Sequence, residues 1–149
     1  MASQDFEIRG YGIKFDHRCG SNTTGEKIRT LLALAPQLRN KVNGWLNDCN
    51  ISPVEANVDD YADFDQDYYN GIPALISTAI MEAEGVGVEC HSDLNGCVYL
   101  VFPACMPWEY NEKERALSEK DIIALLSKYW HMLYEGETDI DRVSIHQYS

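Results

Sequence analysis

Apolar residues recur every three or four positions in four segments of the chain. This spacing places side chains on one face of a helix, so four amphipathic helices are expected. The expected buried stripes are Ile28, Leu31, Leu32 and Ala35 after a Thr23–Glu26 cap; Leu38, Val42, Trp45, Leu46 and Cys49 after Pro36; Ile72, Leu75, Ile76, Ala79, Ile80 and Ala83 between Asn70 and Gly85; and Ile122, Ile123, Leu125, Leu126, Tyr129, Trp130 and Leu133 between a Ser118–Asp121 cap and Gly136.

Alternating or continuous apolar runs predict four strands, over residues 7–16, 86–93, 97–102 and 139–145. Asn95-Gly96 is expected to join the second and third strands, because both residues of a tight hairpin turn need positive φ. The third run is almost wholly apolar and favours a central strand, whereas the charged last run favours an edge. Gly10 and Gly12 predict a bulge or a close backbone approach in the first strand. Residues 104–117 are expected to form a loop.

The order of these elements predicts a single α+β domain over residues 1–149. Its sheet would be small and mostly antiparallel, with about four strands and about four helices packed on it. No long apolar run or leader-like amino terminus is present, so a cytoplasmic location without membrane insertion is expected. The five cysteines are unevenly spaced, which favours reduced thiols over a disulfide framework.

Charge changes this picture because it is distributed very unevenly. Residues 1–54 hold seven basic and five acidic residues, whereas residues 55–149 hold five basic and nineteen acidic ones, for net charges of +2 and −14. The segment 55–69 carries six carboxylates, no base and four aromatic residues, and it is interpreted as an irregular or part-helical surface connection. The overall charge of −12 argues against direct binding to nucleic acid or to an anionic membrane.

The chain matches known metal-binding and catalytic sequence motifs only weakly. Asp63, Asp65 and Asp67 have the spacing of the first ligands of an EF-hand, but Tyr68 stands where the loop needs glycine and Ala74 where it needs glutamate. Zinc sites usually contain a C-x-x-C pair, which the chain lacks. No phosphate-binding glycine loop or nucleophile elbow is present either. No catalytic residue, metal or cofactor is therefore predicted.

Binding is the remaining class of function. Carboxylates can pair with arginine in two-pronged hydrogen bonds, and aromatic rings can stack on guanidinium groups or anchor an interface. The alternative is that the aromatic residues only attach the acidic segment to its own core. The predicted contact residues for a basic partner protein are Asp59, Asp60, Tyr61, Asp63, Phe64, Asp65, Asp67, Trp108, Glu109 and Glu112.

The stretch Met106–Ile122, with Pro107-Trp108, a short Glu-Lys-Glu run and a helix cap, resembles small hypothetical acidic proteins of Firmicutes phages and integrative elements. Asp139-Ile140-Asp141, the helix beginning Gly71-Ile72-Pro73 and the Asn95-Gly96 turn extend the resemblance over about the carboxy-terminal half. The resemblance implies no activity by itself. By analogy of class, small acidic cargo of mobile elements includes inhibitors of host defence, such as anti-CRISPR and anti-restriction proteins.

The sequence therefore leads to three hypotheses. The first is a non-enzymatic inhibitor that places its acidic surface in the basic groove of a nucleic-acid-binding nuclease, with a CRISPR effector as the leading candidate. The second is an accessory mobile-element protein that self-associates, for example as a homodimer, through exposed aromatic residues. The third is an enzyme with an unrecognised site, for which His91, Cys97 and nearby acids are the residues to inspect.

Overall fold

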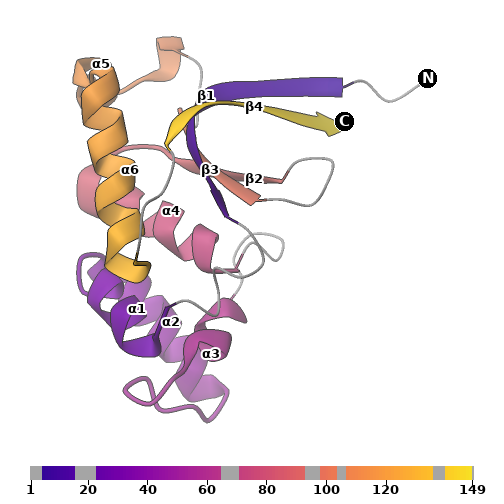
Figure 1. Ribbon diagram of the computed structural model, residues 1–149. Coiled ribbons are helices and arrows are strands. Elements are labelled where there is room, and N and C mark those ends of the chain that lie inside the picture. The colour runs from indigo at the N-terminus through magenta and orange to yellow at the C-terminus, as the bar shows by residue number, and fades with distance from the viewer. Residues whose placement is uncertain are drawn as a thin grey trace.

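The computed structural model describes residues 5–15, 23–64, 71–92, 98–103, 107–135 and 140–148. It confirms an α+β fold with one four-stranded antiparallel sheet, in the order β2-β3-β1-β4 (Figure 1). The strands are β1 (Asp5–Phe15), β2 (Glu89–Ser92), β3 (Val98–Phe102) and β4 (Asp141–Tyr148). The predictions of a central third strand and an edge position for the last strand are confirmed. The Asn95-Gly96 turn lies outside the described residues.

Six α-helices are described, two more than about four expected. They are α1 (Gly25–Leu32), α2 (Pro36–Asp48), α3 (Val58–Ala62), α4 (Gly71–Glu84), α5 (Glu112–Ala116) and α6 (Glu119–Leu133). The extra helices are α3, inside the segment predicted to be partly helical, and α5, inside the predicted loop 104–117. That predicted loop also contains a short 3₁₀ helix, η2 (Pro107–Glu109). Among the described residues, no helix combines the length and the apolar character needed to cross a membrane.

The helices pack together on one side of the sheet. Figure 1 shows α4 beside the sheet, α6 running along its flank, and α1, α2 and α3 grouped at the far end of the molecule. Ile13, Phe15 and Leu100 project from the sheet into the core, where they join the predicted stripes of the helices. Phe15 contacts the aromatic rings of Trp130 and Tyr134, which links β1 directly to the end of α6. The core therefore joins the sheet to all four long helices.

Most residues of the predicted helical stripes are buried. Two stripe residues and one helix cap differ from the prediction. Cys49 and Ala83 were expected in the core but are exposed, because each lies at or near the end of its helix. The cap of α1 is Thr24 instead of Thr23, since the Thr24 side chain accepts the Lys27 amide at 3.2 Å. The caps and stops at Pro36, Ser118 and Gly85 are confirmed; Gly85 has a φ of +70°.

Two glycines allow β1 to bend and the sheet to curl. A Cβ at Gly10 would overlap the Phe102 carbonyl oxygen, and one at Gly12 would overlap that of Leu100, which confirms the predicted close backbone approach. Both glycines lie on the face turned away from the helices, since Ile13 lies on the core face. On that outer face, opposite Gly12, Val101 has no exposed surface. The two edge strands β2 and β4 are also in contact, so the sheet curls around Val101.

Candidate functional site

The acidic segment begins as a loop that is attached to α1. The Arg29 guanidinium donates to the carbonyl oxygens of Pro53 at 3.2 Å and Ala56 at 2.9 Å. The Tyr61 hydroxyl donates to the same Pro53 oxygen at 3.1 Å. At Gly25 there is no room for a side chain, because a Cβ would overlap the Ala56 carbonyl oxygen. The backbone of residues 53–61 therefore lies directly on the first turns of α1.

Tyr61 and Phe64 belong to the core and do not contribute to the surface. Tyr61 has no exposed area, and Phe64 is buried with its ring centroid 5.5 Å from that of Trp45 on α2. The prediction that these two aromatic residues contact a partner is therefore corrected. They instead attach the acidic segment to its own core, as the alternative interpretation of the sequence proposed.

Unlike these aromatic rings, most of the described carboxylates of this segment are exposed. Glu55, Asp59 and Asp63 are exposed, and none of them forms an ion pair among the described residues. Asp60 is half-buried and accepts the Asn57 amide in the capping box that begins α3. Arg29, the base that attaches this segment, directs its hydrogen bonds to neutral oxygens. Asp65 and Asp67 lie outside the described residues.

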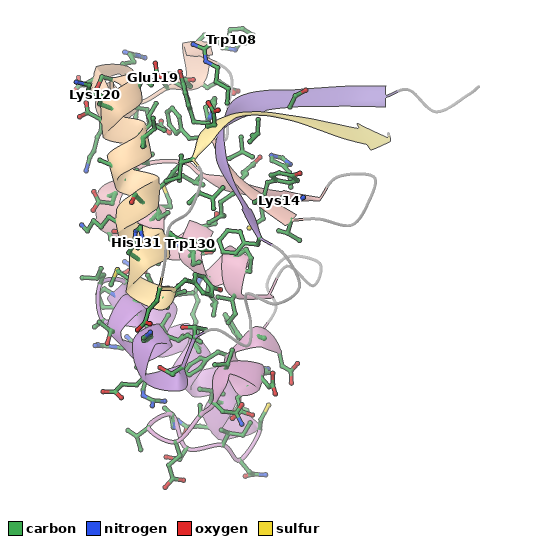
Figure 2. All side chains as sticks on the ribbon, in the orientation of Figure 1. Lys14, Trp108, Glu119, Lys120, Trp130 and His131 are labelled. Carbon is green, nitrogen blue, oxygen red and sulfur yellow. The ribbon has the colours of Figure 1, made fainter. Side chains whose placement is uncertain are left out.

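The remaining predicted contact residues lie at the other end of the molecule. Trp108, on η2, is 77% exposed, and Glu109 and Glu112 are exposed beside it in the chain. Figure 2 places Trp108 at the end of the molecule where α6 begins, whereas Figure 1 places α3 at the opposite end. The structure therefore does not bring the two groups of predicted contact residues together.

The Trp108 end is held by a short helix that sequence reasoning missed. The Asn111 side chain accepts the Glu114 amide at 2.8 Å, and Glu114 accepts the Asn111 amide at 2.9 Å. Glu114 is buried, and its second oxygen accepts the amide of Gly87 at 2.9 Å, which attaches α5 to the segment between α4 and β2. The Asn-x-x-Glu spacing is a capping box and could have revealed this helix.

Two lysines, Lys113 and Lys128, contact Glu84 at the end of α4. Lys128, Lys113 and the Tyr129 hydroxyl all donate to its carboxylate, at 3.2, 3.4 and 3.1 Å. Burial acts to raise the pKa of Glu84, but these hydrogen bonds outweigh it and the pKa is lowered. Burial and the adjacent Glu84 charge raise the pKa of Tyr129. This cluster joins α4, α5 and α6.

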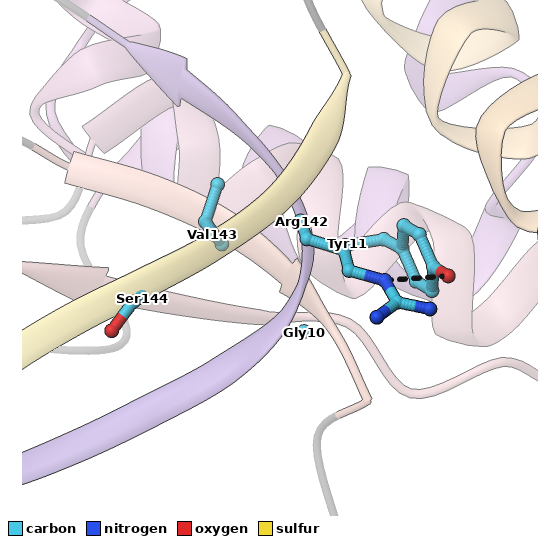
Figure 3. Close-up of a pocket in the computed structure, with 5 residues that line it drawn as sticks. All are labelled: Gly10, Tyr11, Arg142, Val143 and Ser144. Atoms are coloured by element: carbon cyan, nitrogen blue, oxygen red, sulfur yellow. Dashed lines mark hydrogen bonds between the residues drawn. The ribbon is translucent and has the colours of Figure 1, made fainter.

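A hollow of about 430 Å³ lies where β1 and β4 leave the rest of the sheet (Figure 3). Its lining includes Tyr11 and Arg142, and the Arg142 Nε donates to the Tyr11 hydroxyl at 3.2 Å. The guanidinium also lies over the Tyr11 ring, 5.6 Å from its centre. Arg142 is therefore held by Tyr11 at the rim of the hollow.

Candidate residues for catalysis do not converge in the described part of the chain. His91 Nε2 lies 3.1 Å from a carboxylate oxygen of Glu89, two positions away on β2. Cys97 lies outside the described residues. Within the described ranges, no three side chains of the His, Cys, Asp or Glu type are grouped as metal ligands would be. In comparisons with known proteins, no family model, curated protein or solved structure matches this chain.

Proposed function

We propose that this protein is a non-enzymatic inhibitor that binds the basic, nucleic-acid-binding surface of another protein. The observation that carries the proposal is the set of exposed carboxylates at Glu55, Asp59 and Asp63, which have no basic partner among the described residues. Its mechanism is competition with DNA or RNA for a basic groove, without turnover.

The way this segment is attached supports binding by preformed contacts. Arg29 and Tyr61 fix the backbone below the carboxylates, and the capping box of Asn57 and Asp60 fixes the start of α3. Charges held on an ordered backbone lose less conformational freedom on association than charges on a flexible chain. Electrostatic complementarity also speeds association and selects the partner. The acidic end of the molecule is therefore the proposed contact surface.

The resemblance to proteins of phages and integrative elements specifies the partner further. In that setting the partner is a cytoplasmic defence nuclease, and a CRISPR effector loaded with guide RNA is the first to test. The proposal requires no cofactor and no metal. The Trp108 end, which has basic residues of its own at Lys113, Arg115 and Lys120, is left outside the contact.

The test measures binding to a purified Cas9-type effector with guide RNA, together with its DNA cleavage. We expect the wild-type protein to be retained by the effector and to reduce cleavage in proportion to its amount. The variant Asp59→Lys/Asp63→Lys should bind at least about tenfold more weakly, because close charge pairs across an interface contribute about 1.5 kcal/mol or more. Binding should also weaken as salt is added.

A matched control separates local contact from net charge. Glu112→Lys/Glu119→Lys makes the same change in net charge at the Trp108 end, where Figure 2 shows Glu119. It should leave affinity within about threefold of the wild type, the difference being long-range attraction only. Loss of binding in this control alone would contradict the choice of surface. Full cleavage at excess wild-type protein would contradict inhibition of this effector.

A further inference from the structure

Among the described strands, the outer half of β1 pairs with one neighbour. β1 pairs with β3 over Tyr11–Phe15 but with β4 over Asp5–Gly12, so the stretch from Asp5 to Gly10 pairs with β4 alone. Figure 1 shows the two strands running on together past the rest of the sheet, as an arm. An isolated two-stranded ribbon is marginally stable in water, and a third strand would stabilise it. The arm is therefore an incomplete piece of sheet.

The outer edge of β4 is the side on which a further strand can add. Strands at exposed edges are normally protected by lysine, proline, inward-pointing charge or short length. Residues 143–148 read Val-Ser-Ile-His-Gln-Tyr, with no lysine, proline, glycine or carboxylate. The opposite edge strand, β2, has only four residues and carries Glu89. Of the two sheet edges, β4 is the longer, and its residues 143–148 carry none of these protective residue types.

We propose that β4 pairs with β4 of a second copy of this chain, antiparallel about a twofold axis, so that two sheets join into one. The charges of the strand support this occupant. Asp141 and Arg142 lie at its start, and the rest of it contains no Asp, Glu, Lys or Arg. Antiparallel pairing about the middle of the strand places the two Asp141–Arg142 ends at opposite ends of the interface. Like charges, which destabilise a pair of strands when opposite each other, do not meet.

The start of β4 borders the hollow between β1 and β4. Arg142, Val143 and Ser144 border the hollow shown in Figure 3, and Arg142 is drawn toward Tyr11 by its hydrogen bond. The long charged side chain is thereby held on β1 instead of extending past β4. This interface is separate from the acidic segment, and the inference does not depend on the proposed function.

The test is the mass of the intact chain in sedimentation equilibrium over a range of concentrations. We expect the wild-type mass to rise toward twice the chain mass of 16.9 kDa. His146→Lys should remain a monomer, because it places a charge on the edge that the second copy must approach. His146 is in register with Glu7 of β1, and an opposite-charge pair at one register position favours antiparallel pairing, so the pairing of β1 with β4 should be preserved. Gln147→Lys repeats the test on the other face of the strand.

His131→Lys is the matched control, since it makes the same chemical change at an exposed position of α6. It should form dimers like the wild type. Circular dichroism and cooperative urea unfolding establish that each variant is folded. A wild-type mass of one chain at all concentrations would overturn the proposal. Dimers that persist in both folded β4 variants would equally overturn it, because the interface would then lie elsewhere.

Discussion

Removing the hydroxyl of Tyr61 tests how the acidic segment is attached. In Tyr61→Phe, the Pro53 carbonyl oxygen loses one donor at 3.1 Å but keeps Arg29 at 3.2 Å. No acceptor is left without a partner, so the free energy of unfolding should fall by about 1 kcal/mol, the net value of an ordinary hydrogen bond. The ring itself stays in the core and creates no cavity.

Removing the guanidinium should cost more. Arg29→Met keeps much of the aliphatic length but removes charged donors from the carbonyl oxygens of Pro53 and Ala56. Hydrogen bonds to charged groups contribute about 1.5–3 kcal/mol to stability, and partial exposure places this one near the lower end. We expect the free energy of unfolding to fall by about 2 kcal/mol. The Tyr61 hydroxyl still donates to Pro53 in this variant.

The double variant is the decisive measurement, because only there does the Pro53 oxygen lose both donors. A buried polar group left without a partner costs about 1–3 kcal/mol, and the part-buried Pro53 oxygen lies at the lower end of that range, so the combined loss should exceed the sum of the single losses by about 1 kcal/mol. A direct contact between the Arg29 guanidinium and the Tyr61 hydroxyl acts in the opposite sense, but at 3.4 Å it is weak.

The assay is urea unfolding followed by circular dichroism, applied to the wild type, the two single variants and the double variant. Their unfolding free energies are compared with one common slope against urea concentration. Tyr61→Phe combined with Ser118→Ala, at the start of α6, provides a control pair of distant sites that should add within about 0.5 kcal/mol. If the double variant of Tyr61 and Arg29 loses no more unfolding free energy than the two single variants together, the shared-acceptor reasoning is refuted.

Three further predictions concern the scaffold and use the same unfolding assay. Glu84→Gln should lower the free energy of unfolding by about 1 kcal/mol at pH 7. Because folding lowers the pKa of Glu84, the stabilisation by its carboxylate is complete above the ordinary pKa of 4.5 and is lost as the pH falls through the lower pKa of the folded state. The stabilities of the variant and the wild type should therefore converge in acid. Ser118→Ala removes the acceptor of the Asp121 amide and should cost about 1 kcal/mol, while Ser118→Thr should cost less. Gly10→Ala should cost about 1–3 kcal/mol or prevent folding, because its Cβ meets a carbonyl oxygen, whereas Gly44→Ala, with open space around it, should be neutral or stabilising.

The fold class was predictable because the long elements have strong periodicity. The stripe from Ile72 to Ile80 is buried as predicted, and in the apolar run ending at Phe102 the last part of β3, Leu100–Phe102, is buried while Val98 and Tyr99 are half-buried. Local corrections arise where two residues compete for one role: Thr23 and Thr24 both fit a cap, and only the backbone position selects Thr24. Cys49 fits the helical period but lies beyond the last residue of α2, where the packed face ends.

The candidate site was harder to predict, because exposure depends on long-range packing. Carboxylates and aromatic rings alternate in the acidic segment, and their pattern alone cannot show which side faces the core. The structure resolves this for Tyr61 and Phe64, whose partners Arg29 and Trp45 are distant in sequence. The separation of Trp108 from α3 is likewise a property of the tertiary fold (Figure 1, Figure 2).

The two proposals combine without conflict because the surfaces they use are far apart. In Figure 1 the arm of β1 and β4 projects from one end of the molecule and α3 lies at the other. A dimer joined through β4 therefore leaves both acidic segments free, and it carries two copies of the contact surface. Two linked copies bind a partner with two basic sites more tightly than either copy alone, because the second contact becomes intramolecular. The monomeric variant His146→Lys should then bind a partner with one basic site as tightly as the wild type does, and a partner with two basic sites more weakly. This comparison separates the role of the arm from that of the carboxylates.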